Sequence, residues 1–372
     1  YGCRRVIDPK SFAGRLSTEG MTVAEVLECP VSVTSLSTER HERETPQFTR
    51  VTTEIALSGD GKTGRGEDVT YEADAHDDLA AAGLPDLTGE YTLAEFSARV
   101  ADASLFPSPP VRSVSRHYRQ WAIESAALDL ALRQHETDLS TLLDRRREPV
   151  RFVTSMRLGD PPTTERIDTL RERVPGVEFK LDPTQAWDDE LVATLVDTDR
   201  VRILDLKGHY EDTDVDAPAD PELYERLIEA FPEAIIEDPA LTAATRRLFE
   251  ADAVRSRVSW DEPIESLADV KSLPWEPDWL NIKPSRFGRL ESLLETLTYC
   301  DKQGIRCYGG GQFELGVGRG QLQLLASLFY PDGPNDIAPR VYNEPAVGET
   351  LPTSPLSPPA SPRGFRWVPT DE

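Results

Sequence analysis

Residues 201–238 read VRILDLKGHYEDTDVDAPADPELYERLIEAFPEAIIED. This stretch begins with the apolar run VRILDL (201–206), passes through a charged loop into the helical-period segment ELYERLIEAF (222–231), and ends with a second apolar run, AIIED (234–238). Two short apolar runs on either side of an amphipathic helix are typical of parallel strands joined by a helical crossover. The stretch therefore predicts a βαβ unit.

The same rhythm continues on both sides of this unit. Further short apolar runs, with charged helical-period segments between most of them, are VRFVTSM (150–156), VEFKLD (177–182), RVSWD (257–261), WLNIKP (279–284) and IRCYGG (305–310). An eighth strand is expected near Asn335–Ala338. No glycine-rich phosphate turn follows the first strand, as a dinucleotide-binding sheet would require. We therefore expect an α/β chain with a closed (β/α)8-type barrel, a modified TIM barrel.

The residues before the barrel have a different pattern. VLECPVSVTSLS (26–37) and QFTRVTTEIALS (47–58) are rich in Val, Thr and Ile and predict strands, separated by the polar stretch Thr38–Pro46. A Gly/Asp turn and a shorter third strand near Glu67–Tyr71 complete an antiparallel meander. Helical periodicity follows in TLAEFSARVADA (92–103) and in Val114–Leu143.

Composition excludes several classes of protein. The chain has 372 residues, with 41 Lys and Arg against 66 Asp and Glu, for a net charge of −25. This charge repels phosphate backbones and anionic lipid, so we expect neither nucleic-acid nor membrane partners. No apolar run approaches the roughly 18 residues of a membrane-spanning helix. The N-terminal residues do not resemble a signal peptide, and the four cysteines form no CxxC pair, so a cytoplasmic protein with reduced thiols is predicted.

Charged side chains gather where the predicted barrel strands end. Three of the chain's seven lysines and several acids lie at these ends, namely Lys180, Asp182, Asp205, Lys207, Glu237, Asp261, Glu262 and Lys283. The active site of a (β/α) barrel lies at the C-terminal ends of its strands. We therefore expect these side chains to form a site.

Carboxylates that converge from neighbouring strands repel one another unless a cation lies among them. Hard oxygen ligands favour Mg²⁺, or Mn²⁺, over zinc. A lysine near such a cation in a partly dry pocket is suited to general-base chemistry. Together they suit the removal of a proton next to a carboxylate, with the metal stabilising the enolate.

The stretches WAIESAALDLALRQ (121–134), FKLD (179–182), ILDLKG (203–208), IIEDP (235–239), SWDEPIESL (259–267), NIKPSRFGRLESLLE (281–295) and GGGQFELGVGRGQLQLLAS (309–327) resemble the enolase superfamily. The similarity is to its muconate-lactonizing-enzyme branch, in the mandelate racemase/muconate lactonizing enzyme family, and covers roughly Val26 to Pro339. The resemblance implies Asp205, Glu237 and Asp261 as metal ligands and Lys283 as an acid/base.

The resemblance also implies a domain organisation. We expect an N-terminal α+β capping domain (1–145), a catalytic barrel (146–340) and a Pro-rich segment (341–372) that returns to the cap. A small carboxylate substrate is expected, and assembly into a homo-oligomer.

Two departures from the family pattern bear on the reaction. The branch usually has Lys-x-Lys at the end of its second strand, whereas this chain has Lys180 and Asp182. The residue two past the third-strand ligand is usually Asn, and here it is Lys207. Lys180 would help to stabilise an enolate, while Asp182 and Lys207 are candidate catalytic groups. With one clear base, cycloisomerisation or elimination by a dehydratase is favoured over an epimerase reaction.

Other residues and readings stay open at this point. Glu314, after the GGGQF loop, could bind substrate, and Glu262 could orient its neighbours. His41 is read as a solvated residue of the polar loop. A Schiff-base aldolase that uses Lys207 or Lys283 as nucleophile is a rival reading. A non-catalytic relative that binds a ligand is another.

Overall fold

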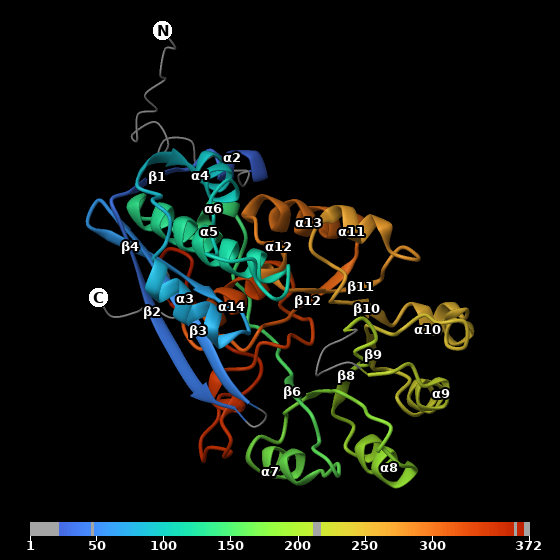
Figure 1. Ribbon diagram of the computed structural model, residues 1–372. Coiled ribbons are helices and arrows are strands. Elements are labelled where there is room, and N and C mark those ends of the chain that lie inside the picture. Colours follow the sequence, from blue (N-terminus) through green and yellow to red (C-terminus); the bar gives the residue numbers. More distant parts are fainter. Residues whose placement is uncertain (1–21, 46–47, 211–216, 361–362, 368–372) are drawn as a thin grey trace.

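The computed structural model describes residues 22–45, 48–210, 217–360 and 363–367 (Figure 1). Predictions that concern residues 1–21, Cys3 included, lie outside these ranges. Among the described residues, no helix is long and apolar enough to cross a membrane.

The second half of the chain is a parallel sheet of seven strands in sequential order. The strands are β6 (Thr154–Met156), β7 (Phe179–Leu181), β8 (Val201–Asp205), β9 (Ile235–Glu237), β10 (Val258–Trp260), β11 (Trp279–Ile282) and β12 (Arg306–Gly309). Each lies within an apolar run that predicts it. The order β12-β11-β10-β9-β8-β7-β6 is that of a barrel wall, in which each strand pairs with the next along the chain.

Residues near the predicted eighth strand connect the two edge strands. Asn335 forms a parallel bridge with Phe152, just before β6, and Asp336 forms one with Gly310, just after β12. The Val153 amide donates to the Asn335 carbonyl at 2.8 Å. The barrel is therefore completed at this position by single bridges rather than by a full strand.

Helices surround this wall (Figure 1). They are α7 (Glu165–Arg173), α8 (Asp189–Asp197), α9 (Pro221–Ala230), α10 (Asp252–Arg255), α11 (Leu267–Ser272), α12 (Pro284–Phe287), α13 (Leu290–Gln303) and α14 (Val317–Phe329), with the 3-10 turns η1 (Arg246–Phe249) and η2 (Arg340–Asn343). Most of these helices bury apolar side chains, as α8 does with Val192 and Leu195. The fold is thus a (β/α)-type barrel.

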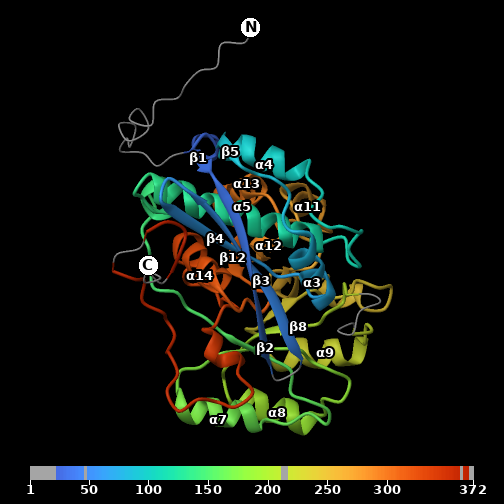
Figure 2. The ribbon, with the colours of Figure 1, turned by 60° about the vertical axis from the view of Figure 1, so that its left-hand side comes forward.

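The first part of the chain is an α+β cap that lies against the barrel (Figures 1 and 2). Its strands are β1 (Pro30–Val33), β2 (Ser35–Glu44), β3 (Thr49–Gly59), β4 (Lys62–Asp68) and β5 (Gly89–Thr92), and its helices are α2 (Val23–Leu27), α3 (Ala73–Ala82), α4 (Leu93–Ala101), α5 (Ser115–Gln134) and α6 (Leu139–Leu143). β2, β3 and β4 form an antiparallel sheet in that order, and β1 pairs with β5.

The meander differs from the prediction in two places. Thr38–Pro46, expected to be a loop, belongs to strand β2 as far as Glu44, so His41 is a strand residue opposite Thr52. β2 is an edge strand whose side chains are mostly exposed, so its sequence lacks the apolar alternation by which strands are recognised. The third strand is β4, which ends at Asp68 and therefore starts and ends earlier than the predicted Glu67–Tyr71.

A tight hairpin turn fixes where β4 begins. Gly59 pairs with Lys62, and between them Asp60 and Gly61 both have positive φ, 51° and 70°. Two central residues with positive φ are typical of the type I′ turn that joins antiparallel strands. This geometry sets β4 earlier than the sequence pattern suggested.

Glycines on β4 allow the long helix α5 to approach closely. A Cβ built at Gly64 would lie 2.2 Å from the Ala126 carbonyl oxygen and 2.2 Å from the Leu130 nitrogen, both backbone atoms of α5. The helix cannot be this close to a larger residue without moving.

Gly64→Ala is therefore expected to lower the free energy of unfolding by about 1–3 kcal/mol, because overpacking forces the helix and the sheet apart. Urea denaturation followed by circular dichroism measures the loss. Gly176→Ala is the matched control, because nothing lies within 4 Å of a Cβ built there. Equal stability of the two variants would contradict the packing described for β4 and α5.

The last described residues pack on the same helix. The Phe365 amide and the Arg366 Nε both donate to the buried Asp129 carboxylate at 2.8 Å, and the Phe365 ring lies edge-on to Trp121. The division of the chain into 1–145, 146–340 and 341–372 stays a prediction.

Candidate active site

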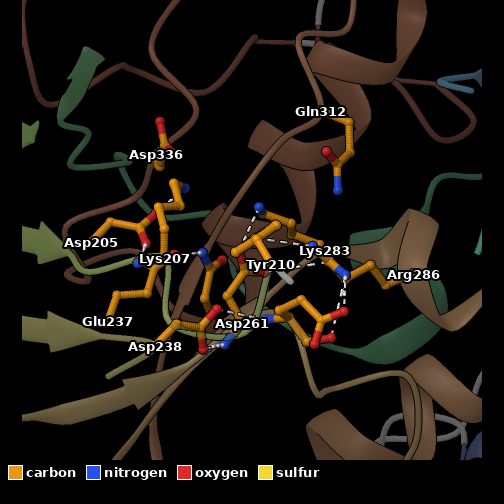
Figure 3. Close-up of polar contacts among 12 residues, drawn as sticks. Asp205, Lys207, Tyr210, Glu237, Asp238, Asp261, Lys283, Arg286, Gln312 and Asp336 are labelled. Carbon is orange, nitrogen blue, oxygen red and sulfur yellow. Dashed lines mark hydrogen bonds and ion pairs between the residues drawn. The ribbon is translucent and has the colours of Figure 1, made fainter. Parts of the chain in front are cut away.

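The predicted site residues meet at one end of the barrel (Figure 3). Lys180 lies in β7, Asp205 and Glu237 end β8 and β9, and Asp261 and Lys283 directly follow β10 and β11. The C-terminal ends of parallel strands point to the same face of a barrel, which is why these residues come together. The three acids are fully buried, and the two lysines nearly so.

Asp205 forms ion pairs with two lysines. The Lys180 Nζ lies 3.0 Å from Asp205 Oδ2, and the Lys207 Nζ forms an ion pair with the same oxygen. The Lys207 backbone amide donates to Asp205 Oδ1 at 3.3 Å. Burial alone would raise the pKa of the Asp205 carboxyl, but the two ammonium groups hold it well below its usual range.

The Lys180 ammonium also connects Asp205 to the next strand. Its Nζ donates to Glu237 Oε1 at 2.6 Å and lies 3.5 Å from Asp336 Oδ2. Burial would lower the pKa of Lys180, but Asp205 and Glu237 raise it well above its usual value. Lys180 is therefore a fixed positive charge among three carboxylates.

Glu237 is bonded through both of its oxygens. In addition to Lys180, Asn281 donates to Oε1 at 3.2 Å, and the Tyr308 hydroxyl donates to Oε2 at 2.6 Å. Burial, followed by the charge of Asp205, raises the pKa of Glu237. These contacts orient the Glu237 carboxylate rigidly at the end of β9.

Asp261 forms the other half of the site with Lys283. The Lys283 Nζ donates to Asp261 Oδ2 at 2.6 Å, and the Tyr210 hydroxyl donates to the same oxygen at 2.9 Å. Arg286 Nε lies 3.5 Å from Asp261 Oδ1, which accepts no hydrogen bond within the described residues. Burial would raise the pKa of Asp261, but Lys283 and Arg286 lower it.

Asp238 lies between Glu237 and Asp261. Its two oxygens accept the backbone amides of Asp261 and Glu262 at 2.8 and 2.9 Å. Burial, together with the charge of Asp261, raises the pKa of Asp238 to about 7. The carboxylate is thus held by neutral donors and has no cation bonded to it among the described contacts.

The acids at the centre of this face fit a hard divalent cation. Within the described part of the chain, Glu237, Asp238 and Asp261 each offer a buried oxygen, and these atoms all lie within 4.8 Å of one another. Asp205 is not a member of this group. Carboxylate oxygens suit Mg²⁺, and the unbonded Asp261 Oδ1 is a buried acceptor that a cation would satisfy.

The remaining predicted residues lie around this centre. The Asp182 carboxylate accepts a hydrogen bond from Arg157 Nε at 3.1 Å, and Asp182 Oδ1 lies 4.0 Å from the Lys207 Nζ. Burial raises the pKa of Asp182, although the charge of Lys207 opposes this shift. Asp182 and Lys207 therefore lie together on the Asp205 side of the site.

The two glutamates predicted beside the site have different surroundings. Glu262 lies 4.0 Å from Arg286 at the edge of the acidic group. Glu314 accepts the Gln312 amide at 2.6 Å and forms an ion pair with Arg319 at 3.1 Å. Glu314 thus ties the loop after β12 to α14.

Strained backbone is found at the same face. Of the non-glycine residues with positive φ, Lys207 (53°), Asp238 (46°) and Phe313 (56°) follow β8, β9 and β12. L side chains rarely adopt this conformation, and such strain persists where surrounding contacts hold it. The chain is therefore constrained where the charged side chains converge.

Cap residues cover the barrel mouth. The Tyr71 hydroxyl donates to Gln312 Oε1 at 2.8 Å, and Gln312 Nε2 donates to the Tyr118 hydroxyl at 3.3 Å. The ring of Phe48 lies 5.4 Å from that of Phe313, edge to face. Figure 3 shows Gln312 above the site with its amide toward Lys283.

Sequence reasoning assigned no role to several members of the site, namely Tyr210, Asp238, Asn281, Arg286, Tyr308 and Asp336. Strand alternation was an available signal for two of them. Asn281 lies two residues before Lys283, and Tyr308 lies two residues before Gly310, so each residue faces the same side as its partner. Asp238 directly follows Glu237. No sequence signal marks Tyr210, which reaches Asp261 from the loop after β8.

Two family models match the chain. DUF8230, described as a domain of unknown function, matches with its N-terminal domain at residues 24–142 and its C-terminal domain at residues 146–344. The chain belongs to the DUF8230 family. No curated protein matches the DUF8230 chain in sequence.

Solved structures similar to this DUF8230 chain are members of the enolase superfamily. A superfamily member from Enterococcus faecalis V583 has 20% sequence identity and a TM-score of 0.59, with 83% of this chain and 86% of that chain covered. A probable mandelate racemase from Alicyclobacillus acidocaldarius has 21% identity and a TM-score of 0.58, with 83% and 87% covered.

A third similar structure is muconate cycloisomerase from Pseudomonas fluorescens, with 17% identity, a TM-score of 0.60, and coverage of 83% and 87%. The predicted fold, a (β/α) barrel with an α+β cap as in the enolase superfamily, is therefore confirmed. At these identities the likeness establishes the fold alone.

Proposed function

We propose that this DUF8230 protein is a Mg²⁺-dependent enzyme that abstracts the proton α to the carboxylate of a small substrate. The observation that carries the proposal is the buried contact of Lys283 with Asp261, beside the acidic group at the barrel mouth. An amine next to carboxylates that suit a cation combines a proton-transfer group with a means of holding negative charge. The fold shared with mandelate racemase and muconate cycloisomerase supports the same class of reaction.

Glu237, Asp238 and Asp261 are the residues that would hold the ion. When bound, Mg²⁺ supplies positive charge that stabilises a substrate carboxylate as it becomes an enolate. Mn²⁺ has the same preference for oxygen ligands and can replace it. Asp205, a ligand by family resemblance, would instead position Lys180 and Lys207.

Lys283 would transfer the proton. Its Nζ lies 2.6 Å from Asp261, which holds it in place. Lys180, fixed between Asp205 and Glu237, would contribute positive charge toward the developing enolate. Gln312 and the cap aromatics above would limit the entry of water.

The reaction would be of the cycloisomerase or dehydratase type, with the epimerase type less favoured. An epimerase needs a proton-transfer group on each face of the substrate. The other two candidate groups are engaged elsewhere, because Asp182 is bonded to Arg157 and Lys207 is paired with Asp205. Although burial would lower the pKa of the paired Lys207, Asp182 and Asp205 raise it, which makes Lys207 a poor nucleophile and gives no support to an aldolase that uses it. Cytoplasmic location and assembly into a homo-oligomer remain predictions from the sequence.

The proposed ligand set predicts which acids affect metal binding. Asp238→Asn is expected to weaken Mn²⁺ binding about tenfold or more, because it removes a ligand charge. Asp205→Asn is expected to leave the dissociation constant within about threefold, because its carboxylate is bonded to lysines. Electron paramagnetic resonance of free Mn²⁺ measures both, with Asp197→Asn, an exposed acid of α8, as control.

The outcomes separate the assignments. If Asp205→Asn strongly weakened Mn²⁺ binding and Asp238→Asn did not, Asp205 would be a ligand and the set proposed above would be wrong. No Mn²⁺ binding by the wild type at millimolar concentration would overturn the metal-dependent function itself.

A further inference from the structure

A cavity whose lining includes none of the acids and lysines at the barrel mouth is rich in arginines. It has a volume of about 1340 Å³ and lies between the cap strands β2 to β4, the start of α14 and residues 339–341. The arginines along it are Arg40, Arg43, Arg65, Arg133, Arg319, Arg340 and Arg366, and we call it the arginine groove. Only two acids, Glu42 and Glu54, are part of its lining. This is unusual in a chain whose net charge is −25.

Some of these arginines are neutralised locally. Arg40 pairs with Glu42, Arg65 pairs with Glu54, and Arg366 pairs with the buried Asp129. These pairs account for both acids of the lining. Paired in this way, these arginines do not by themselves suggest a ligand.

Arg43 also has a partner, Glu344 at 3.1 Å, whereas Arg340 is bonded to a backbone carbonyl. Arg340 Nη1 donates to the Leu315 carbonyl, and no ion pair of Arg340 occurs among the described residues. Burial, followed by the charge of Arg43, lowers the pKa of Arg340, and Arg319 contributes in the same direction. Glu67 and Glu344 oppose this shift, so Arg340 lies among charges of both signs, and an anion in the groove would add a direct partner for its guanidinium group.

Two buried nitrogens in the groove have no hydrogen-bond partner within the described ranges. One is the Nε of Arg319, a side chain about nine-tenths buried whose Nη2 pairs with Glu314. The other is the Nε2 of His41, on strand β2. A Cβ at Gly316 would lie 3.4 Å from the His41 ring, so the ring lies against the start of α14. Buried polar groups without partners are costly, which points to an absent ligand.

We propose that the arginine groove binds a small anion that carries at least two phosphate or carboxylate groups. Guanidinium groups match these oxyanions with paired hydrogen bonds. The volume is ample for a compound of nucleotide size. A long polyanion such as nucleic acid is disfavoured, because the rest of the molecule would repel it. The proposal is independent of the function assigned to the barrel mouth.

Isothermal titration calorimetry with pyrophosphate, in metal-free buffer of fixed ionic strength, tests the proposal. The wild type is expected to bind, and Arg340→Gln is expected to raise the dissociation constant about tenfold, as the loss of a charge-assisted hydrogen bond predicts. Arg319→Gln is a second variant with the same expectation. Arg246→Gln, an exposed arginine of η1, is the matched control and should bind as the wild type does.

Lys283→Met separates the groove from the barrel mouth, because pyrophosphate could also meet the cations there. Binding that persists in Lys283→Met and weakens in Arg340→Gln and Arg319→Gln supports the groove. Binding lost in Lys283→Met but unchanged in both arginine variants would overturn it, as would the absence of binding by the wild type at 10 mM pyrophosphate, on the order of the weakest specific affinities.

Discussion

Lys283→Met is expected to lower the rate of α-proton exchange of a carboxylate substrate by about 10²–10⁴-fold, the usual contribution of a positioned acid or base. Methionine keeps the length and apolar character of the side chain but cannot carry a proton. The Lys283 Nζ is 2.6 Å from Asp261 and the residue is 7% exposed, so water has little access to replace it. Proton exchange with deuterated water, followed by NMR, measures the loss.

The same variant should bind Mn²⁺ with nearly unchanged affinity, since Asp261 keeps its contact with Tyr210 and its place in the acidic group. Lys271→Met, on the exposed face of α11, is the matched control and should exchange at the wild-type rate. If Lys283→Met exchanged the proton as fast as the wild type, another residue would be the base.

Arg119→Met is expected to lower the free energy of unfolding by about 3–5 kcal/mol, because it leaves the carboxylate of Asp68 buried without its counter-ion. Both side chains are fully buried in the cap, with Arg119 Nε 2.7 Å from Asp68 Oδ2. Arg119 also donates to the carbonyls of Leu105 and Ala75 at 2.8 Å. Burial would raise the pKa of Asp68, but Arg119 holds it below its usual value.

Urea denaturation of single and double variants separates the charge from the packing. Asp68→Asn with Arg119→Met should recover part of the loss, since no unpaired charge then remains. A loss below about 1 kcal/mol in Arg119→Met, in the range of an exposed ion pair, would contradict the buried pair as described.

The barrel was predictable because its strands are buried on both sides. Each apolar run contains the strand found there, as VRILDL (201–206) contains β8. The acids and lysines that end these runs lie at one end of the barrel. β2 was not predictable, because an exposed edge strand needs no apolar residues and is defined by its pairing with β3. The position of a strand in a sheet is therefore easier to infer when both of its faces are covered.

The site was predictable as a set of residues but not as a set of contacts. The sequence places Lys180, Asp205 and Glu237 at neighbouring strand ends, yet the bond from Lys180 to Glu237 crosses from β7 to β9 inside the barrel. The curvature of the sheet decides such contacts, and no spacing along the chain encodes them. For the same reason Asp238, rather than Asp205, joins the acidic group of Glu237 and Asp261.

The central claim is tested most directly by incubating the wild type with a panel of small carboxylic acids in deuterated water, with Mg²⁺ and with a chelator in its place. The proposed function predicts that at least one acid exchanges its α-proton for deuterium, and that the chelator stops this exchange. Exchange that continues in the chelator would contradict the metal requirement. If no acid exchanges while the protein binds Mg²⁺ and the acids, it is a ligand-binding relative rather than an enzyme.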